Sequence, residues 1–166
     1  MKRFSGIDLP PLFLEPGQLF VDLRPALVET ILGSCVAVTM FCRQGRFGGI
    51  CHALLPDGPP EQPGHHLTGA VPLLLEQMLR LGSNRACLEI KLFGGGNVLG
   101  ISTPERPGIG EQNAACAMAL LRRLDLPIMA SDTGGRQGRR LYFNSGTGEV
   151  FVRTMRKRQP ATATMA

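Results

Sequence analysis

Two nearly continuous apolar runs in the first third of the chain predict a β-hairpin. Residues 36–42 and 47–55 are rich in apolar and β-branched side chains, and the polar segment 43–46 between them contains a glycine. Strand-length apolar runs on either side of such a break are typical of two antiparallel strands joined by a turn. In a hairpin closed by this turn, facing residues have numbers that add up to about 89.

Further segments have the length and composition of strands. In residues 86–93, Glu89 and Lys91 alternate with apolar side chains, which is the period of a strand with one buried face. The polar segment 145–148 contains two glycines between two strand-like runs and predicts a second hairpin. The other predicted strands cover residues 18–22, 26–32, 128–130, 140–144 and 149–155.

Two segments repeat apolar residues at the spacing of one helix face. The first is expected to begin at a Thr68 cap and to end near Gly82, and its apolar face consists of Val71, Leu74, Leu75 and Met78. The second covers residues 111–124, with a predicted buried face of Ala114, Ala117, Met118 and Leu121. Because strands outnumber helices and separate them along the chain, we expect an α+β domain with mixed strands and helices packed outside.

The predicted hairpin brings a cysteine and a histidine close together. In its register His52 faces Ala37, and Cys35 lies two residues earlier on the same strand face. Cys35 and His52 are then diagonal neighbours, roughly 7–8 Å apart between Cα atoms, whereas a register shifted by one residue places them on opposite faces. A thiol beside a histidine is the minimal arrangement for nucleophilic catalysis, and the simpler alternative is that Cys35 is a small buried apolar residue.

Other residues around this pair suggest chemistries that the sequence favours less. Cys42, Cys51 and His52 are ligand types for zinc, but closed zinc sites supply four ligands at tighter spacing. Ser34 is a candidate nucleophile by its position, but no G-x-S-x-G motif surrounds it and a thiol is the better nucleophile at neutral pH. We therefore expect neither a metal nor a cofactor.

Size and composition fit one globular domain. The chain has 166 residues, 43% of them hydrophobic, and no run approaches the about 20 apolar residues of a membrane-spanning helix. The basic N-terminus reaches Asp8 and two prolines before any apolar stretch, which argues against a signal peptide. Five cysteines without a C-x-x-C pair favour reduced thiols and a cytoplasmic location. We expect a catalytic domain over residues 1–155 and a basic, disordered tail over residues 156–166.

The net charge of +5 does not indicate a nucleic-acid-binding protein. Much of this charge lies in Arg153, Arg156, Lys157 and Arg158, next to or within the predicted tail. The chain has no tryptophan and one tyrosine, so it has few of the aromatic side chains on which bases stack. Nucleic acid is therefore not an expected partner.

Six segments in a fixed order carry a family resemblance. They are residues 15–21 (EPGQLFV), 30–38 (TILGSCVAV), 48–56 (GGICHALLP), 88–97 (LEIKLFGGGN), 108–113 (GIGEQN) and 132–139 (DTGGRQGR). Together they extend over nearly the whole chain, and they resemble the CheD family, the chemoreceptor glutamine deamidases of bacterial chemotaxis.

The resemblance implies a fold and three catalytic roles. The implied fold is a layered α/β sandwich related to the catalytic domains of deamidating bacterial toxins. Cys35 matches the family's nucleophile and His52 its catalytic histidine. The third catalytic residue, a threonine before the cysteine, matches Thr30 or, in strict register, the position of Glu29. Adjacent strand residues point to opposite faces, so only one of these two can orient His52.

The implied reaction converts glutamine side chains of chemoreceptors to glutamate and releases ammonia. Cys35 would attack the carboxamide carbon, His52 would transfer protons, and water would hydrolyse the resulting thioester. Backbone N–H groups near Ser34 and Cys35 are candidates to stabilise the oxyanion. Hydrolysis of methyl esters at the same receptor positions is a further expected activity.

The resemblance also implies partners. They are the cytoplasmic helices of chemoreceptors as substrate and a CheC-type phosphatase as a second partner, with a non-catalytic adaptor as the alternative function. Two sites depart from the family pattern: residues 65–68 (HHLT) replace an acidic residue before the first long helix, and Gln112 stands where arginine is frequent. Neither departure affects Cys35 or His52.

Overall fold

The predicted hairpin forms the centre of the fold. Strands β4 (Val36–Cys42) and β5 (Phe47–Ala53) pair in antiparallel orientation, and Ala37 lies opposite His52, which confirms the predicted register. Every residue of both strands is buried, because the sheet that contains them is covered on both faces. The structure is a computed structural model and describes residues 8–156.

The central sheet has five strands in the order β2-β5-β4-β6-β7. Strand β6 pairs antiparallel with β4, and the edge strand β7 pairs parallel with β6. The strands that flank the hairpin are β2 (Leu19–Asp22), β6 (Leu88–Gly94) and β7 (Ile128–Thr133). Strand β7 continues three residues beyond the predicted strand, because β6 pairs with it as far as Gly94.

A second sheet has four strands in the order β1-β3-β8-β9. The predicted second hairpin is confirmed by the antiparallel pairing of β8 with β9. The sequence did not predict β1, a three-residue strand of exposed residues that begins with proline and pairs parallel with β3. The strands are β1 (Pro11–Phe13), β3 (Leu27–Leu32), β8 (Arg139–Asn144) and β9 (Val150–Thr154).

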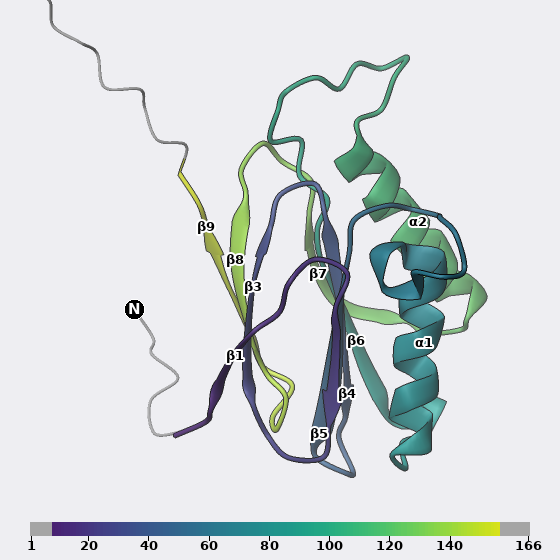
Figure 1. Cartoon of the computed structure of the whole chain (residues 1–166), viewed down its shortest axis with the longest axis vertical. Coiled ribbons are helices and arrows are strands. Elements are labelled where there is room, and N and C mark those ends of the chain that lie inside the picture. The colour runs from purple at the N-terminus through teal and green to yellow at the C-terminus, as the bar shows by residue number, and fades with distance from the viewer. Residues whose placement is uncertain (1–7, 157–166) are drawn as a thin grey trace, which may run out of the picture.

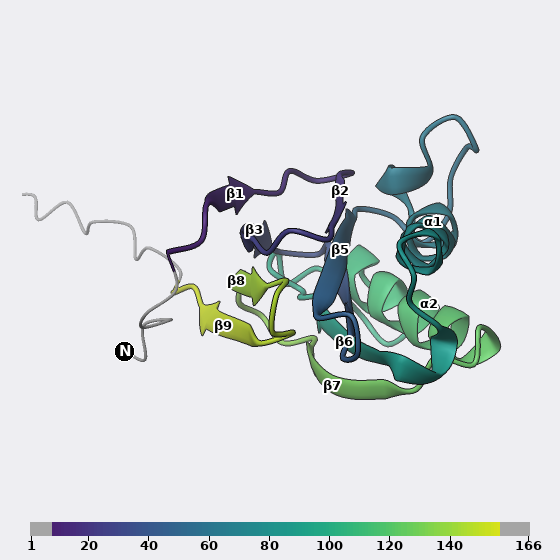
Figure 2. The same cartoon turned by 90° about the horizontal axis from the view of Figure 1, so that it is seen from below.

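The two sheets and two helices form three layers (Figure 1). Seen from below, the five-stranded sheet lies between the four-stranded sheet and the helices α1 (Leu67–Arg80) and α2 (Ile109–Arg123) (Figure 2). One core fills the space between the helices and the central sheet, and a second core, which includes Val28, Ile50 and Phe143, lies between the sheets. This arrangement is the α+β layered sandwich that the sequence predicted. Neither helix in the part of the chain described is long and apolar enough to cross a membrane.

Helix α1 differs from the prediction at its N-terminal cap. The helix begins at Leu67, and the ring of His66 accepts a hydrogen bond from the backbone N–H of Gly69 at 3.1 Å. The predicted cap, Thr68, instead donates its hydroxyl to Asp57 at 2.6 Å. His66 takes the capping position because its backbone is extended, as a capping residue requires. The predicted end is confirmed, because Gly82 follows the helix with φ of +107°.

Helix α2 differs from the prediction in the residues that it buries. It begins at Ile109, and Met118 is exposed although it was predicted to be buried. Asn113 is fully buried instead. The physical reason is that two backbone carbonyls lie within reach of the Asn113 amide, so a polar side chain replaces an apolar one in this part of the buried face.

The N-terminal turn of α2 approaches the end of β6 closely. A Cβ atom at Gly110 would overlap the backbone carbonyl of Gly96, and one at Gly94, where φ is +105°, would overlap the carbonyl of Cys35. Glycine at both positions therefore allows α2, the end of β6 and the segment before β4 to pack together.

We expect Gly110→Ala to destabilise the protein by about 1–3 kcal/mol, because the added methyl group forces α2 away from Gly96. Alanine in a helix is otherwise favoured over glycine by about 1 kcal/mol, so the steric and propensity effects have opposite signs. Urea denaturation of both proteins measures the difference. Ala115→Gly at an exposed position of the same helix reports the propensity effect alone. A Gly110→Ala protein as stable as the parent would contradict the close approach.

Candidate active site

Strand β3 points Thr30, and not Glu29, into the space between the sheets. Thr30 is fully buried, whereas Glu29 lies on the outer face and forms an ion pair with Arg140 of β8. The Thr30 hydroxyl lies 2.7 Å from Nδ1 of His52. The structure therefore brings together Thr30 and His52 and separates Glu29 from them.

The hydrogen bonds of Thr30 determine which nitrogen of His52 carries the proton. The Thr30 hydroxyl lies 2.7 Å from the carbonyl oxygen of Leu14, which can only accept a hydrogen bond. A hydroxyl has one proton, and here it is donated to Leu14. His52 must then donate its Nδ1–H to Thr30, so the lone pair of the neutral ring is on Nε2.

His52 is buried as a neutral base. Its side chain is 1% exposed, and burial lowers its pKa from 6.5 to about 4. The Nε2 atom is buried without a hydrogen-bond partner. A buried acceptor without a partner costs free energy, and such atoms in native proteins are commonly found at sites that bind or transfer a proton.

Cys35 lies immediately before β4, one residue beyond the last pair of the β4–β5 ladder and two residues before Ala37, which faces His52. It is half-buried, packs against the core between the sheets and is a free thiol. Burial raises the pKa of its thiol, and the backbone N–H of Cys35 partly opposes that shift. Both groups therefore rest in their neutral forms, a thiol and an imidazole, and no hydrogen bond joins them among residues 8–156.

Hydrogen bonds from two directions hold the segment before β4. The N–H groups of Gly95 and Gly96 donate to the carbonyls of Cys35 and Gly33, at 2.8 and 2.9 Å. From the other side, Nδ2 of Asn113 donates to the carbonyl of Ser34 at 2.9 Å. Sequence reasoning gave Asn113 no role, although this residue ends the segment 108–113 that carries part of the family resemblance.

The candidate zinc ligands do not converge. Cys51 packs in the core beneath the helices, while His52, the next residue of the same strand, points to the opposite face. Cys42 lies at the other end of β4, with its Sγ 3.5 Å from that of Cys87. Within residues 8–156, no three His, Cys, Asp or Glu side chains are grouped to hold a metal ion.

The two departures from the family pattern have local structural partners. His66 caps α1, and its Nε2 lies 2.9 Å from the carbonyl of Pro59. Gln112 donates its side-chain amide to the carbonyl of Pro107 at 2.9 Å. Both side chains thus organise loops near the ends of helices.

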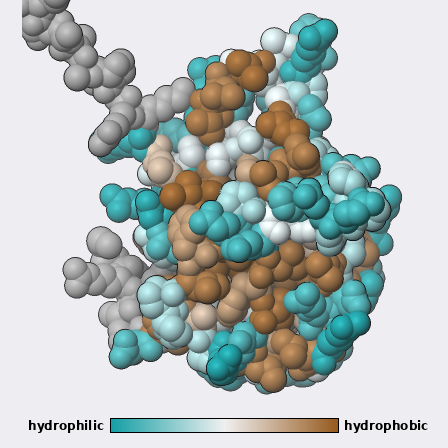
Figure 3. Space-filling model, in the orientation of Figure 1, coloured by the Kyte–Doolittle hydropathy of each residue, from teal (hydrophilic) through white to brown (hydrophobic). Residues whose placement is uncertain are grey.

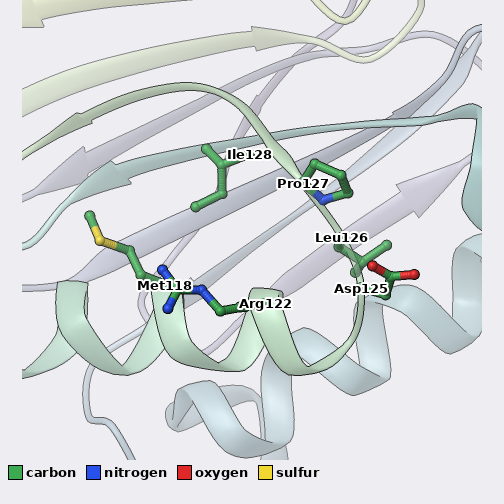
Figure 4. A pocket seen from close by; sticks show the side chains of 6 residues that line it. All are labelled: Met118, Arg122, Asp125, Leu126, Pro127 and Ile128. Atoms are coloured by element: carbon green, nitrogen blue, oxygen red, sulfur yellow. The ribbon is translucent and has the colours of Figure 1, made fainter.

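A surface hollow of about 390 Å³ lies at the far end of α2 from Asn113 (Figure 4). Its lining contains no cysteine, serine or histidine, and its charged members are Arg122 and Asp125. It therefore has no nucleophile or base of the kind found between the sheets. The lining residues are Met118, Arg122, Asp125, Leu126, Pro127 and Ile128.

We expect His52 to make folding stability depend on pH. Because its pKa is 6.5 when unfolded and about 4 when folded, the unfolded chain binds protons more readily in this range. The contribution of His52 to the free energy of unfolding is fully present above its unfolded-state pKa. It is lost as pH falls towards the folded-state pKa, by about 3 kcal/mol in total. Urea denaturation at about pH 7 and about pH 5 should show about 2 kcal/mol of this loss, because the lower pH is still above the folded pKa.

The matched variants are His52→Gln and His65→Gln. The first removes the buried titrating group and should flatten the loss of stability between the two pH values. The second removes an exposed histidine and should retain the parent's loss. Equal pH dependence in the parent and His52→Gln would show that His52 is not buried as a neutral base.

Comparison with known proteins shows the family of this chain. The family model of CheD chemotactic sensory transduction matches residues 54–154. A probable chemoreceptor glutamine deamidase CheD 2 from Geobacter sulfurreducens is 40% identical over 90% of this chain and 92% of its own length. Probable chemoreceptor glutamine deamidases from Maridesulfovibrio salexigens and Pyrococcus horikoshii are 38% and 39% identical, over 90% and 74% of this chain and 95% and 78% of their own lengths. The chain therefore belongs to the CheD family.

Proposed function

We propose that this protein deamidates glutamine side chains of chemoreceptors, with Cys35 as the nucleophile and His52 as the general base. The observation that carries the proposal is the buried, unpartnered Nε2 of His52, whose ring is oriented by Thr30 and whose diagonal neighbour is a free thiol. The names of the relatives, probable chemoreceptor glutamine deamidases, supply the substrate class.

The first half of the reaction transfers one proton and forms one covalent bond. As Sγ of Cys35 attacks the carboxamide carbon, Nε2 of His52 accepts the thiol proton. The neutral resting forms of both groups imply that this proton moves during the attack, not before it. The resulting imidazolium then protonates the amide nitrogen, ammonia leaves, and a thioester remains on Cys35.

The second half of the reaction regenerates the enzyme. His52 Nε2 deprotonates a water molecule, which attacks the thioester carbon, and the Cys35 sulfur leaves and regains its proton. The product is a glutamate side chain. The Ser34 N–H donates no hydrogen bond within residues 8–156, and the Cys35 N–H is directed towards its own sulfur. We propose that these two amides stabilise the tetrahedral oxyanion.

Thr30 acts in this mechanism through His52. By accepting the Nδ1–H, it selects the tautomer whose lone pair is on Nε2, and it fixes the plane of the ring. The imidazolium that forms during the reaction also donates to Thr30. Glu29 does not take this role in the proposed mechanism, because it lies on the outer face and is paired with Arg140.

The exposed apolar surface of the segment between β6 and α2 is consistent with a protein substrate. Figure 3 shows apolar surface at the end of the molecule where Figure 1 places the segment between β6 and α2. In that segment Leu99 is 80% exposed and Ile101 is 71% exposed. We propose that these side chains contact receptor helices, since large exposed apolar residues commonly mark a protein-binding surface.

The proposal predicts deamidation that depends on Cys35. Incubation with a chemoreceptor cytoplasmic fragment from the same organism should convert specific glutamines to glutamates, measured as the amide-to-acid mass increase. Cys35→Ala should abolish the increase, whereas Cys87→Ala, a thiol at the far end of the sheet, should retain it. If the parent protein converts no glutamine to glutamate, the proposed deamidase activity is wrong. A Cys35→Ala protein that still supports receptor signalling would indicate an adaptor acting through a CheC-type phosphatase.

The role of Thr30 predicts a difference between three variants. Thr30→Val keeps the shape but removes the hydroxyl, so the wrong tautomer becomes accessible and kcat should fall roughly 10- to 100-fold. Thr30→Ser retains the hydroxyl and should retain most of the activity. Glu29→Gln changes only the outward-facing partner of Arg140 and should leave kcat near the parent value. Loss of activity in Glu29→Gln with retention in Thr30→Val would reverse the assignment.

The same thiol also suits methyl esters of receptor glutamates. An ester carbonyl is attacked by a thiol more readily than an amide carbonyl, and methanol then leaves in place of ammonia. We propose this hydrolysis as a second activity of the Cys35–His52 pair, to be measured as methanol release from a methylated receptor fragment.

A further inference from the structure

We propose that Asn113 is a positioning residue that fixes Cys35 relative to His52. The inference rests on the proposed function, in which these two residues must act together. Asn113 lies in the second turn of α2, is fully buried, and reaches the ends of both strands that carry the pair.

The pairing of β4 with β5 ends before it reaches Cys35. The last pair of the ladder is Val36 with Ala53, and the next two positions, Cys35 and Leu54, are not paired. Beyond this point the two strands diverge into separate loops. Strand pairing alone therefore does not hold Cys35 at a fixed distance from His52.

Asn113 bridges the two strands where the ladder stops. Its Nδ2 donates one hydrogen bond to the carbonyl of Ser34 and another to the carbonyl of Leu54, both at 2.9 Å. Ser34 is the residue before Cys35, and Leu54 is the second residue after His52. One amide group therefore links the chain next to the nucleophile to the chain next to the base.

The chemistry of this link requires a group with two N–H donors. Both partners are carbonyl oxygens, which only accept, so a carboxylate would repel them and a hydroxyl could satisfy only one. The Oδ1 atom of Asn113 is buried without a partner. An apolar side chain of the same size would leave the carbonyls of Ser34 and Leu54 without these donors, which costs more than the one unpaired oxygen of the amide.

The position of Asn113 is fixed by close packing of α2 against the segment that follows β6. Gly110, one turn earlier in α2, lies against the carbonyl of Gly96, and the N–H groups of Gly95 and Gly96 donate to the carbonyls on either side of Ser34. Figure 1 shows the N-terminal end of α2 at the end of the sheets where β3 turns into β4. The segment before β4 is thus held between β6 and α2.

The expected kinetic effect separates positioning from substrate binding. Asn113 is buried and cannot touch a receptor, so its loss should leave KM unchanged. Loss of the two hydrogen bonds lets Cys35 move relative to His52, and a displacement of about 1 Å at reacting groups lowers kcat roughly 100-fold.

The test uses the reaction of Cys35 with iodoacetamide, which needs no receptor. The full chain and Asn113→Leu, which has similar size but no donors, are alkylated at about pH 7, and modification of the Cys35 peptide is followed by mass spectrometry. Each is also examined with His52→Gln added. Leu121→Ala, on the buried face of the same helix, controls for lost stability. Asn113→Ala replaces Asn113→Leu if the latter does not fold.

We expect Asn113→Leu to slow alkylation of Cys35 roughly tenfold when His52 is present, because the thiol loses its base, and to have no further effect with His52→Gln. Leu121→Ala should alkylate at the parent rate. Parent-like alkylation of Asn113→Leu, or an equal effect in both backgrounds, would overturn the positioning role. If His52→Gln alone does not slow alkylation, both the Cys35–His52 pair and the role of Asn113 are wrong. If Asn113→Leu slows alkylation only when His52 is present, but the parent protein does not deamidate receptors, the proposed function is rejected and the role of Asn113 is retained.

Discussion

The register of the β4–β5 hairpin is the constraint on which the rest of the site depends. With Ala37 opposite His52, the imidazole points into the space between the sheets, where Thr30 of the other sheet reaches it. A shift of one residue would turn the ring towards the helices and exchange it with Cys51. The register is strongly determined because both faces of this sheet are buried, so a shift by one residue would exchange the contents of the two cores.

Burial has two effects on the chemistry of this pair. It holds the thiol and the imidazole in their neutral forms, which protects the resting protein from keeping an unpaired charge in the core. It also strengthens the hydrogen bonds that orient the base, because the space between the sheets excludes water. Thr30 needs no charge to perform this task. Its hydroxyl is held by the Leu14 carbonyl, so the direction of each hydrogen bond in the chain from Leu14 to His52 is fixed.

Much of this arrangement could be predicted from the sequence, and the failures have physical causes. The hairpin register followed from the position of one turn, because two apolar strands of similar length have few alternatives. The choice between Thr30 and Glu29 did not follow, because it depends on a one-residue offset in β3 that only pairing with β8 determines. Asn113 lies in a segment that carries the family resemblance, but its role did not follow because its partners are backbone carbonyls distant in sequence. The exposed strand β1 had no apolar period to indicate it.

The protonation state of His52 tests the central claim most directly, because the account requires a neutral ring with its proton on Nδ1. Nitrogen NMR of the protein labelled at histidine distinguishes the two neutral tautomers and the imidazolium, with His52→Gln used to assign the signal. The account predicts that at about pH 7 Nδ1 is protonated and Nε2 is not, and that the ring titrates near its pKa of about 4. An imidazolium at neutral pH, or a proton on Nε2, would contradict it.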